Sequence, residues 1–263
     1  MSVKPQIPIV NLGYLNASGC VHSNVDATTI SISAGQLRDS TNTFDIIVNS
    51  PLTVSTTFNG AGGLDQGDIA VNTIYGVYVL YDSSQTNNPV GILSLSGSPL
   101  MPSVNGVTYS HFRCIGFIKT QFAVTDITKF DVCGEGNDRT HLWADDQLAV
   151  AVGSATTLTP VSLAAGVPSL IQFLPNSPKS ICAILSVIFS PATASDSIQL
   201  WPFNTGLNYS SVLYGQVATV SISSQFLVAS NLTNAGDYKI QYIVESLTGS
   251  TVDIDIDGFN YTI

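Results

Sequence analysis

Apolar and polar residues alternate with a period of two along most of this chain of 263 residues. The alternation is clear at residues 28–33, residues 73–81 form a strong strand pattern rich in aromatic and β-branched side chains, and residues 111–119 form a further strand pattern. Such alternation places every second side chain on the same face of a strand. Strong helix formers are scarce, since the chain has only Glu135 and Glu245 as glutamates. The pattern therefore predicts an all-β fold with little or no helix.

Turn residues interrupt this alternation about every 8–12 residues, which is typical of sandwiches and barrels. A second series of strand patterns begins near residue 145, after a polar segment at residues 138–146. We therefore expect two β-sandwich or jelly-roll-like domains. The predicted organisation is an extended N-terminal arm (residues 1–20), an N-terminal β domain (21–145) and a C-terminal β-sandwich (146–263).

The charge of the chain excludes several kinds of partner. Its net charge is −10, its pI is near 4.3, and its eight Lys and Arg residues are scattered. Phosphate backbones require clustered cations, so a nucleic-acid partner is not expected. No apolar run reaches the length of a membrane span, so membrane insertion is not expected either. Because 44% of the residues are hydrophobic and only 10% are charged, part of the surface is expected to be covered by further copies of the chain.

The four cysteines are widely separated, at Cys20, Cys114, Cys133 and Cys182. Their spacing fits neither a zinc site nor a dense disulfide framework. We expect small buried thiols, with one bridge between Cys114 and Cys133 as the alternative.

The sequence contains no recognisable catalytic constellation, and we do not expect an enzyme. The three histidines, His22, His111 and His141, are not accompanied by a nucleophile motif. The densest polar cluster, residues 138–146, is interpreted as a domain junction with a surface Asp/Arg pair. Two glutamates outside any motif give little support for glycoside cleavage.

The last strand pattern contains Asp253, Asp255 and Asp257, which alternate with isoleucines before Gly258. This D-x-D-x-D-G order matches the first half of a calcium-binding loop. The same alternation is what a strand with one solvated acidic face requires. If the segment is a calcium-binding loop, a bound Ca²⁺ is predicted. If it is a strand with a solvated acidic face, no cofactor is expected.

A candidate ligand-binding loop follows the strand pattern that ends at Trp201. Aromatic faces and amide side chains of this kind suit carbohydrate or protein docking. The alternative is that Trp201 packs in the core. The candidate residues are Trp201, Phe203, Asn204, Asn208 and Tyr209.

Six segments of the first half carry a resemblance to known proteins: 38–46 (RDSTNTFDI), 59–65 (NGAGGLD), 72–80 (NTIYGVYVL), 91–94 (GILS), 98–102 (SPLMP) and 112–116 (FRCIG). In this order they resemble modules of bacteriophage virion structural proteins of the tail-fibre, spike and head-decoration type. Residues 252–259 are similar to the closing strand of such modules. The chain differs at Ile74 and Phe112, where an aromatic residue and a second arginine are usual.

The resemblance implies a non-enzymatic component of the particle surface: a capsid decoration, a spike or a tail-fibre knob. A compact knob or decoration fits better than a slender fibre, because no short repeat forms a shaft. The expected partners are further copies of the chain, as a trimer, other virion proteins, and a host glycan or receptor.

Residues 1–8 lack the apolar core of an export signal, so we expect the protein to be made in the host cytoplasm and released by lysis within the virion. The rival hypothesis is a carbohydrate-binding or polysaccharide-depolymerising module of a tail spike.

Overall fold

The structure is a computed structural model. In the first half of the chain it describes residues 17–84, 88–104, 106–121, 123–134 and 136–143. In the second half it describes residues 161–162, 169–172, 181–190, 197–202, 211–214, 222–230, 239–245 and 251–263. Within these ranges every regular element is a strand, which confirms the all-β fold. The same residues contain no helix that is long and apolar enough to span a bilayer.

Among the residues that the structure describes, thirteen strands precede residue 144 and eight follow it. Those of the first half are β1 (Ala17–Gly19), β2 (His22–Asn24), β3 (Thr29–Ile32), β4 (Gly35–Arg38), β5 (Asp45–Val48), β6 (Leu52–Ser55), β7 (Ile74–Tyr81), β8 (Val90–Ser94), β9 (Ser103–Val104), β10 (Val107–Thr108), β11 (His111–Lys119), β12 (Phe130–Cys133) and β13 (Asp138–Trp143). Those of the second half are β14 (Val161–Ser162), β15 (Ser169–Gln172), β16 (Ile181–Ser190), β17 (Ser197–Pro202), β18 (Ser211–Tyr214), β19 (Ile222–Ser230), β20 (Lys239–Glu245) and β21 (Thr251–Thr262).

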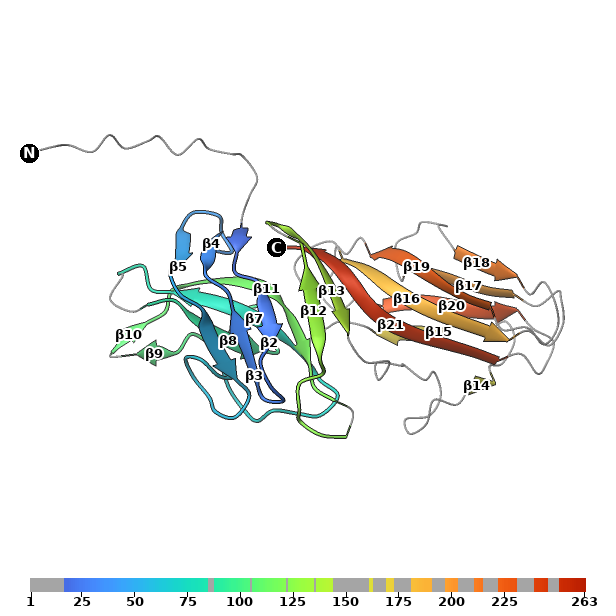
Figure 1. Cartoon of the computed structure of the whole chain (residues 1–263), viewed down its shortest axis with the longest axis horizontal. Coiled ribbons are helices and arrows are strands. Elements are labelled where there is room, and N and C mark those ends of the chain that lie inside the picture. Colours follow the sequence, from blue (N-terminus) through green and yellow to red (C-terminus); the bar gives the residue numbers. More distant parts are fainter. Residues whose placement is uncertain are drawn as a thin grey trace, which may run out of the picture.

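The strands form small antiparallel sheets. Three of these lie in the first half and have the orders β1-β4-β5, β2-β3-β6 and β11-β7-β8, with a separate β9–β10 hairpin. The second half contributes the sheet β15-β20-β17-β18. A further sheet, β12-β13-β21-β16-β19 with β14 against β21, contains strands from both halves. Figure 1 shows strands β1 to β11 in one lobe and β15 to β20 in the other, with β12 and β13 between them.

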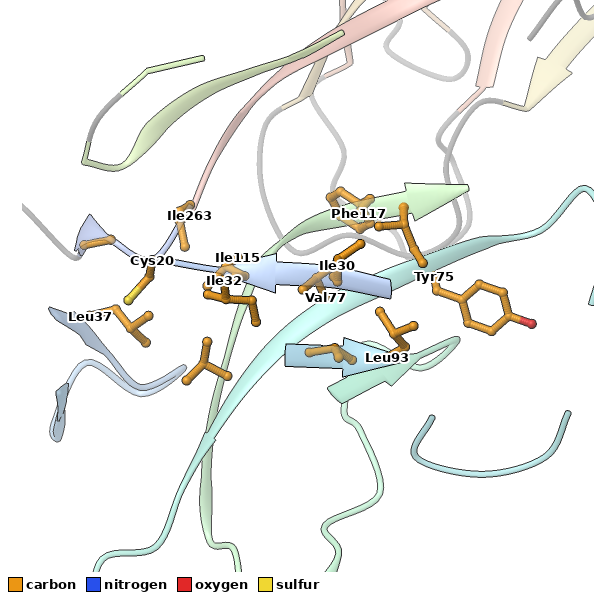
Figure 2. Close-up of a cluster of buried hydrophobic side chains, with 14 of the residues drawn as sticks. Cys20, Ile30, Ile32, Leu37, Tyr75, Val77, Leu93, Ile115, Phe117 and Ile263 are labelled. Carbon is orange, nitrogen blue, oxygen red and sulfur yellow. The ribbon is translucent and has the colours of Figure 1, made fainter. Parts of the chain in front are cut away.

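Strand β7 is the centre of the first lobe, because both of its faces are buried. Tyr75, Val77 and Val79 point into the larger hydrophobic core. Tyr78 and Leu80 point to the opposite side, into a smaller core. Figure 2 shows the larger core, in which side chains from β3, β4, β7, β8 and β11 meet. Burial of each such side chain contributes roughly 1.5–3 kcal/mol.

The last strand, β21, connects the two halves of the chain. It pairs with β16 over most of its length, and its residues 258–262 also pair with β13. Figure 1 shows it running from the second lobe towards the first. Phe259, Tyr261 and Ile263 are buried in the larger core of the first lobe. The C-terminal residues are therefore part of the fold of the N-terminal half.

Two segments differ from their sequence-based interpretation. Residues 17–19, placed in an extended arm, form strand β1, which pairs with β4. Residues 138–143, interpreted as a junction, form strand β13, in which Arg139 is only 2% exposed. The surface Asp/Arg pair expected there was wrong for Arg139, because this side chain is directed into the core.

Candidate functional site

Many polar residues of the first lobe lie along the two edges of the sheet β11-β7-β8, where three other segments of the chain cover these edges. The first segment is the loop between β4 and β5, which contains Asp39. The carboxylate of Asp39 accepts hydrogen bonds from the backbone N–H groups of Thr43 (2.9 Å) and Phe44 (3.1 Å) and from the Thr41 hydroxyl (2.8 Å). Its second oxygen lies 3.0 Å from Nδ1 of His111, on β11.

Asp39 is a buried carboxylate, and both of its oxygens have hydrogen-bonding partners. Burial raises its pKa, but the hydrogen bonds from Thr41, Phe44 and Thr43 outweigh this effect and lower the pKa to about 2. A carboxylate held in this way stays ionised at neutral pH and is not a proton donor. Asp39 therefore organises the loop around itself.

The same loop is fastened to the outer edge of β11. Ser40 donates its backbone N–H to the carbonyl of Phe112 at 2.7 Å. Arg113 donates from Nη1 to the carbonyl of Asp39 and to Oδ1 of Asn42, both at 3.0 Å. Asn42 has a φ of 60°, a conformation that asparagine adopts more readily than most residues. These contacts close one end of the β11 edge.

The second segment, residues 59–65, runs along the outer edge of β8. Gly62 N–H donates to the carbonyl of Gly91 (2.9 Å), and Leu93 exchanges hydrogen bonds with Gly63 O and Asp65 N–H (both 2.8 Å). The Asp65 carboxylate then accepts hydrogen bonds from the Ser94 hydroxyl at 2.6 Å and from the backbone N–H of Leu100 at 3.1 Å. The NGAGGLD segment therefore extends the sheet at its second edge.

The third segment is β13, whose Arg139 joins a carbonyl of the β11 edge to carbonyls at the end of β1. Its guanidinium donates to the carbonyls of Gly19 (2.7 Å), Cys20 (2.8 Å) and Ile115 (3.2 Å). The Tyr261 hydroxyl, on β21, also donates to Ile115 O, at 3.0 Å. The guanidinium of Arg139 is therefore held by backbone carbonyls, and the groups whose charge acts on it are Tyr261 and the thiols of Cys20 and Cys114.

Two histidines are buried beside Arg139. His22, on β2, contacts the carbonyl of Phe117 through Nε2 at 3.0 Å, and burial lowers its pKa to about 3. His141, on β13, is sandwiched between the rings of Phe130 and Phe259, with both ring centroids at 4.8 Å. Neither of its nitrogens has a hydrogen-bond partner among the described residues, and burial lowers its pKa well below the usual value.

This arrangement fits the closure of sheet edges, and its buried histidines and Arg139 are shielded from solvent. Acid–base catalysis requires a titratable group that can reach a substrate. His22, His141 and Arg139 are at most 2% exposed, and each contacts backbone carbonyls or aromatic rings. Within the described residues, no three His, Cys, Asp or Glu side chains are positioned to hold a metal ion.

The cysteines are free thiols at the three positions where the structure describes the side chain. Cys20 is buried and Cys114 is half-buried, and desolvation raises the pKa of both to about 11. Cys133 is exposed, so the expectation of a buried thiol was wrong at this position. A bridge between Cys114 and Cys133 is absent from the structure. Cys182 lies on β16, where only the backbone is described.

The residues proposed from the sequence for ligand binding remain a prediction. Trp201 lies on β17, where its backbone is paired with Gln241 of β20. The other four, Phe203, Asn204, Asn208 and Tyr209, lie outside the described residues.

The three aspartates proposed for calcium lie in strand β21. Asp253 pairs with Ile188 and Asp255 with Ser186, both on β16. Asp257 lies where the register of this pairing shifts. The segment is therefore a strand, as in the alternative interpretation of its alternation, and not a loop of the kind that surrounds calcium in D-x-D-x-D-G motifs. The calcium site itself remains an untested prediction.

The sequence provided only part of the signal for the site. Asp39, Asn42, Asp65 and Arg113 are all within the segments that carry the phage resemblance. The pairing of Asp39 with Arg113, more than seventy positions later, could not be read from the pattern. The roles of His22 and Arg139 were missed, because their partners are backbone carbonyls of distant segments.

Comparison with known proteins provides little further guidance. No protein-family profile matches the chain. No curated protein matches it either. Among solved structures, it is similar to a Bacillus thuringiensis Cry1Da tryptic core variant, with a TM-score of 0.24 and 8% sequence identity. The alignment covers 93% of this chain and 51% of the Cry1Da chain, so this chain spans about half the length of that protein.

Proposed function

We propose that this protein is a non-enzymatic structural component of a bacteriophage particle, located at the particle surface. In this role it is a capsid decoration, a spike or a tail-fibre knob that assembles as a homo-oligomer, with the trimer as the expected form. Its partners are other virion proteins and a host glycan or receptor. It is made in the host cytoplasm and is carried out of the cell in the released particle.

One observation carries the proposal. The segments that resemble phage virion modules, residues 38–46 and 59–65, are the ones that close the two edges of the sheet β11-β7-β8. A motif used in this way supports a structural role, since closed edges prevent uncontrolled strand pairing. The hydrogen bonds of Asp39, His22 and Arg139 to backbone groups of neighbouring segments support a mechanical role, because they hold these segments together.

The experiment is to find the protein on the particle. Antibodies raised against the full chain should label purified particles of the virus that encodes it in immuno-electron microscopy, at one repeated position. The protein should also be present in the mass spectrum of washed particles. Absence from washed particles, together with presence in the lysate, would refute the structural role.

The rival function, a carbohydrate-binding or depolymerising module, makes a different prediction. Incubation of the purified protein with host surface polysaccharide would then release oligosaccharides. The proposed function allows binding of the polysaccharide but no cleavage, so chromatography of the products separates the two. The residues that suggested the rival lie at positions 201–209, and no observed contact among the described residues favours it.

A further inference from the structure

Strand β5 (Asp45–Val48) differs from the other sheet edges described above. It is the outer strand of β1-β4-β5 and pairs only with β4. The edges of β8 and β11 are covered by loops and side chains, whereas no backbone group of Asp45 or Ile47 on the outer side has a hydrogen-bond partner among the described residues. An open edge is a template for another strand.

The phase of the ladder shows which groups this edge presents. Asp39 N–H donates to Phe44 O, in the same register in which Leu37 pairs with Ile46. Residues of an antiparallel pair alternate between hydrogen-bonded and non-hydrogen-bonded positions. Asp45 and Ile47 therefore occupy the non-hydrogen-bonded positions towards β4. Their N–H and C=O groups point away from β4, towards the open side.

The side chains at this edge favour association over solvation. Ile47 is 51% exposed in the middle of the strand, although Ile46 and Val48 on either side of it are buried. Arg38, on β4, forms an ion pair with Asp45 at 3.3 Å, so this face carries no net charge. In a chain with a net charge of −10, copies repel each other over most of their surface. A neutral face with an exposed isoleucine is where repulsion is weakest.

We propose that β5 pairs with β5 of a second copy in antiparallel fashion across a two-fold axis. The occupant of the edge is this same chain, because a two-fold pairing satisfies the chemistry of both edges at once. The preferred register places Ile47 opposite Ile47 of the partner subunit, and the two residues exchange both of their outward backbone hydrogen bonds. Asp45 then faces Asn49 of the partner subunit, so that no like charges are opposed.

This inference deepens the proposed function by naming the surface through which copies associate, and it rests on that function only for its biological setting. A two-fold contact is isologous and joins subunits in pairs. It is therefore distinct from the contact of a trimer and, where both form, it links trimers to each other. Because an edge of four residues buries less area than a standard interface, we expect a dissociation constant in the micromolar range.

The first test is sedimentation equilibrium of the full chain at concentrations up to about 100 µM. We expect the mass to double with rising concentration, from one chain to two or, where the trimer forms, from three chains to six. The Ile47→Lys variant should raise the dissociation constant at least about tenfold, because a charged edge residue opposes strand addition. The matched control is Val25→Lys, which changes another exposed apolar residue (59% exposed) away from β5 and should not affect the constant.

The second test is cross-linking, which reports the register. A hydrogen-bonded antiparallel pair has its Cα atoms about 5.5 Å apart, within the range that a disulfide spans. In a Cys133→Ser background, which removes the exposed native thiol, mild oxidation of the Ile47→Cys variant should yield a covalent dimer. The Val25→Cys variant should remain monomeric on a non-reducing gel.

The outcomes separate the two proposals. Three results would each overturn the β5 contact, even if the protein is found on particles. The first is a monomer at every concentration, and the second is a trimer whose mass Ile47→Lys leaves unchanged. The third is the absence of a cross-link in the Ile47→Cys variant. A dimer that depends on Ile47, formed by a protein that is absent from particles, would support the contact and refute the proposed function.

Discussion

Acidification should destabilise this protein well above the pH at which its carboxylates are protonated. His22 and His141 are fully buried, and burial lowers the pKa of both below the ordinary value of 6.5. Above that pH, both residues are neutral whether the chain is folded or unfolded, so stability does not depend on them. Below it, the unfolded chain binds protons that the folded chain does not, and the free energy of unfolding falls.

The size of the effect follows from the number of histidines. Each pH unit below the unfolded pKa costs about 1.36 kcal/mol per histidine that stays neutral when folded. At pH 4.5, about two units lower, the two residues together should cost about 5 kcal/mol. Asp39, with its pKa lowered to about 2, loses its contribution only as the pH falls below about 4, so it does not contribute in this window.

The assay is urea unfolding between pH 7.5 and about 4.5, followed by Trp143 fluorescence in a Trp201→Phe background. Trp143 contacts His141, with the ring centroids 4.2 Å apart, and therefore reports on this cluster. The His141→Phe variant keeps an aromatic ring between Phe130 and Phe259 and removes one of the two histidines. We expect it to lose about half as much stability as the parent over the same range. Equal loss in both proteins, or none in the parent, would refute the reasoning.

Three further predictions concern single contacts. Asp39→Ala should lower the free energy of unfolding at pH 7 by about 1–3 kcal/mol in urea titrations, because the backbone N–H groups of Thr43 and Phe44 and the Thr41 hydroxyl lose the carboxylate that accepts from them; a change within error would contradict the role of this carboxylate. Gly91→Ala should lower the free energy of unfolding by about 2 kcal/mol or more, since the added Cβ would overlap side chains of β3 and β6; an unchanged melting temperature would show that these side chains can move to make room for it. A thiol reagent should modify Cys133 rapidly but Cys20 and Cys114 only after unfolding, as followed by peptide mass spectrometry; equally fast labelling of all three would show that the core is open.

The strands with strong apolar patterns were predictable from the sequence. Residues 73–81 and 111–119 became β7 and β11, and residues 252–263 became most of β21. Strand β7 is buried on both faces, so its signal is a run of β-branched and aromatic residues, whereas in β21 isoleucines alternate with aspartates. The all-β fold was predictable for the same reason.

Strand β13 was not recognised because its inward positions carry Arg139 and His141. Inward polar residues hide the hydrophobic alternation, and the segment then resembles a surface cluster. The partners that make these residues tolerable are carbonyls on β11 and near β1, more than twenty and more than a hundred positions away. Such contacts depend on the tertiary fold and have no local signal.

The central claim is that the motif loops are hydrogen-bonded parts of the sheet β11-β7-β8, and amide hydrogen exchange tests it most directly. The backbone N–H groups of Ser40, Gly62 and Asp65 lie in loops, but each donates to a carbonyl of an edge strand. We predict that these amides exchange as slowly as those within β7, whereas the Ile47 amide of the monomer exchanges rapidly. Exchange of Ser40, Gly62 and Asp65 at the rate of open loops would contradict the account.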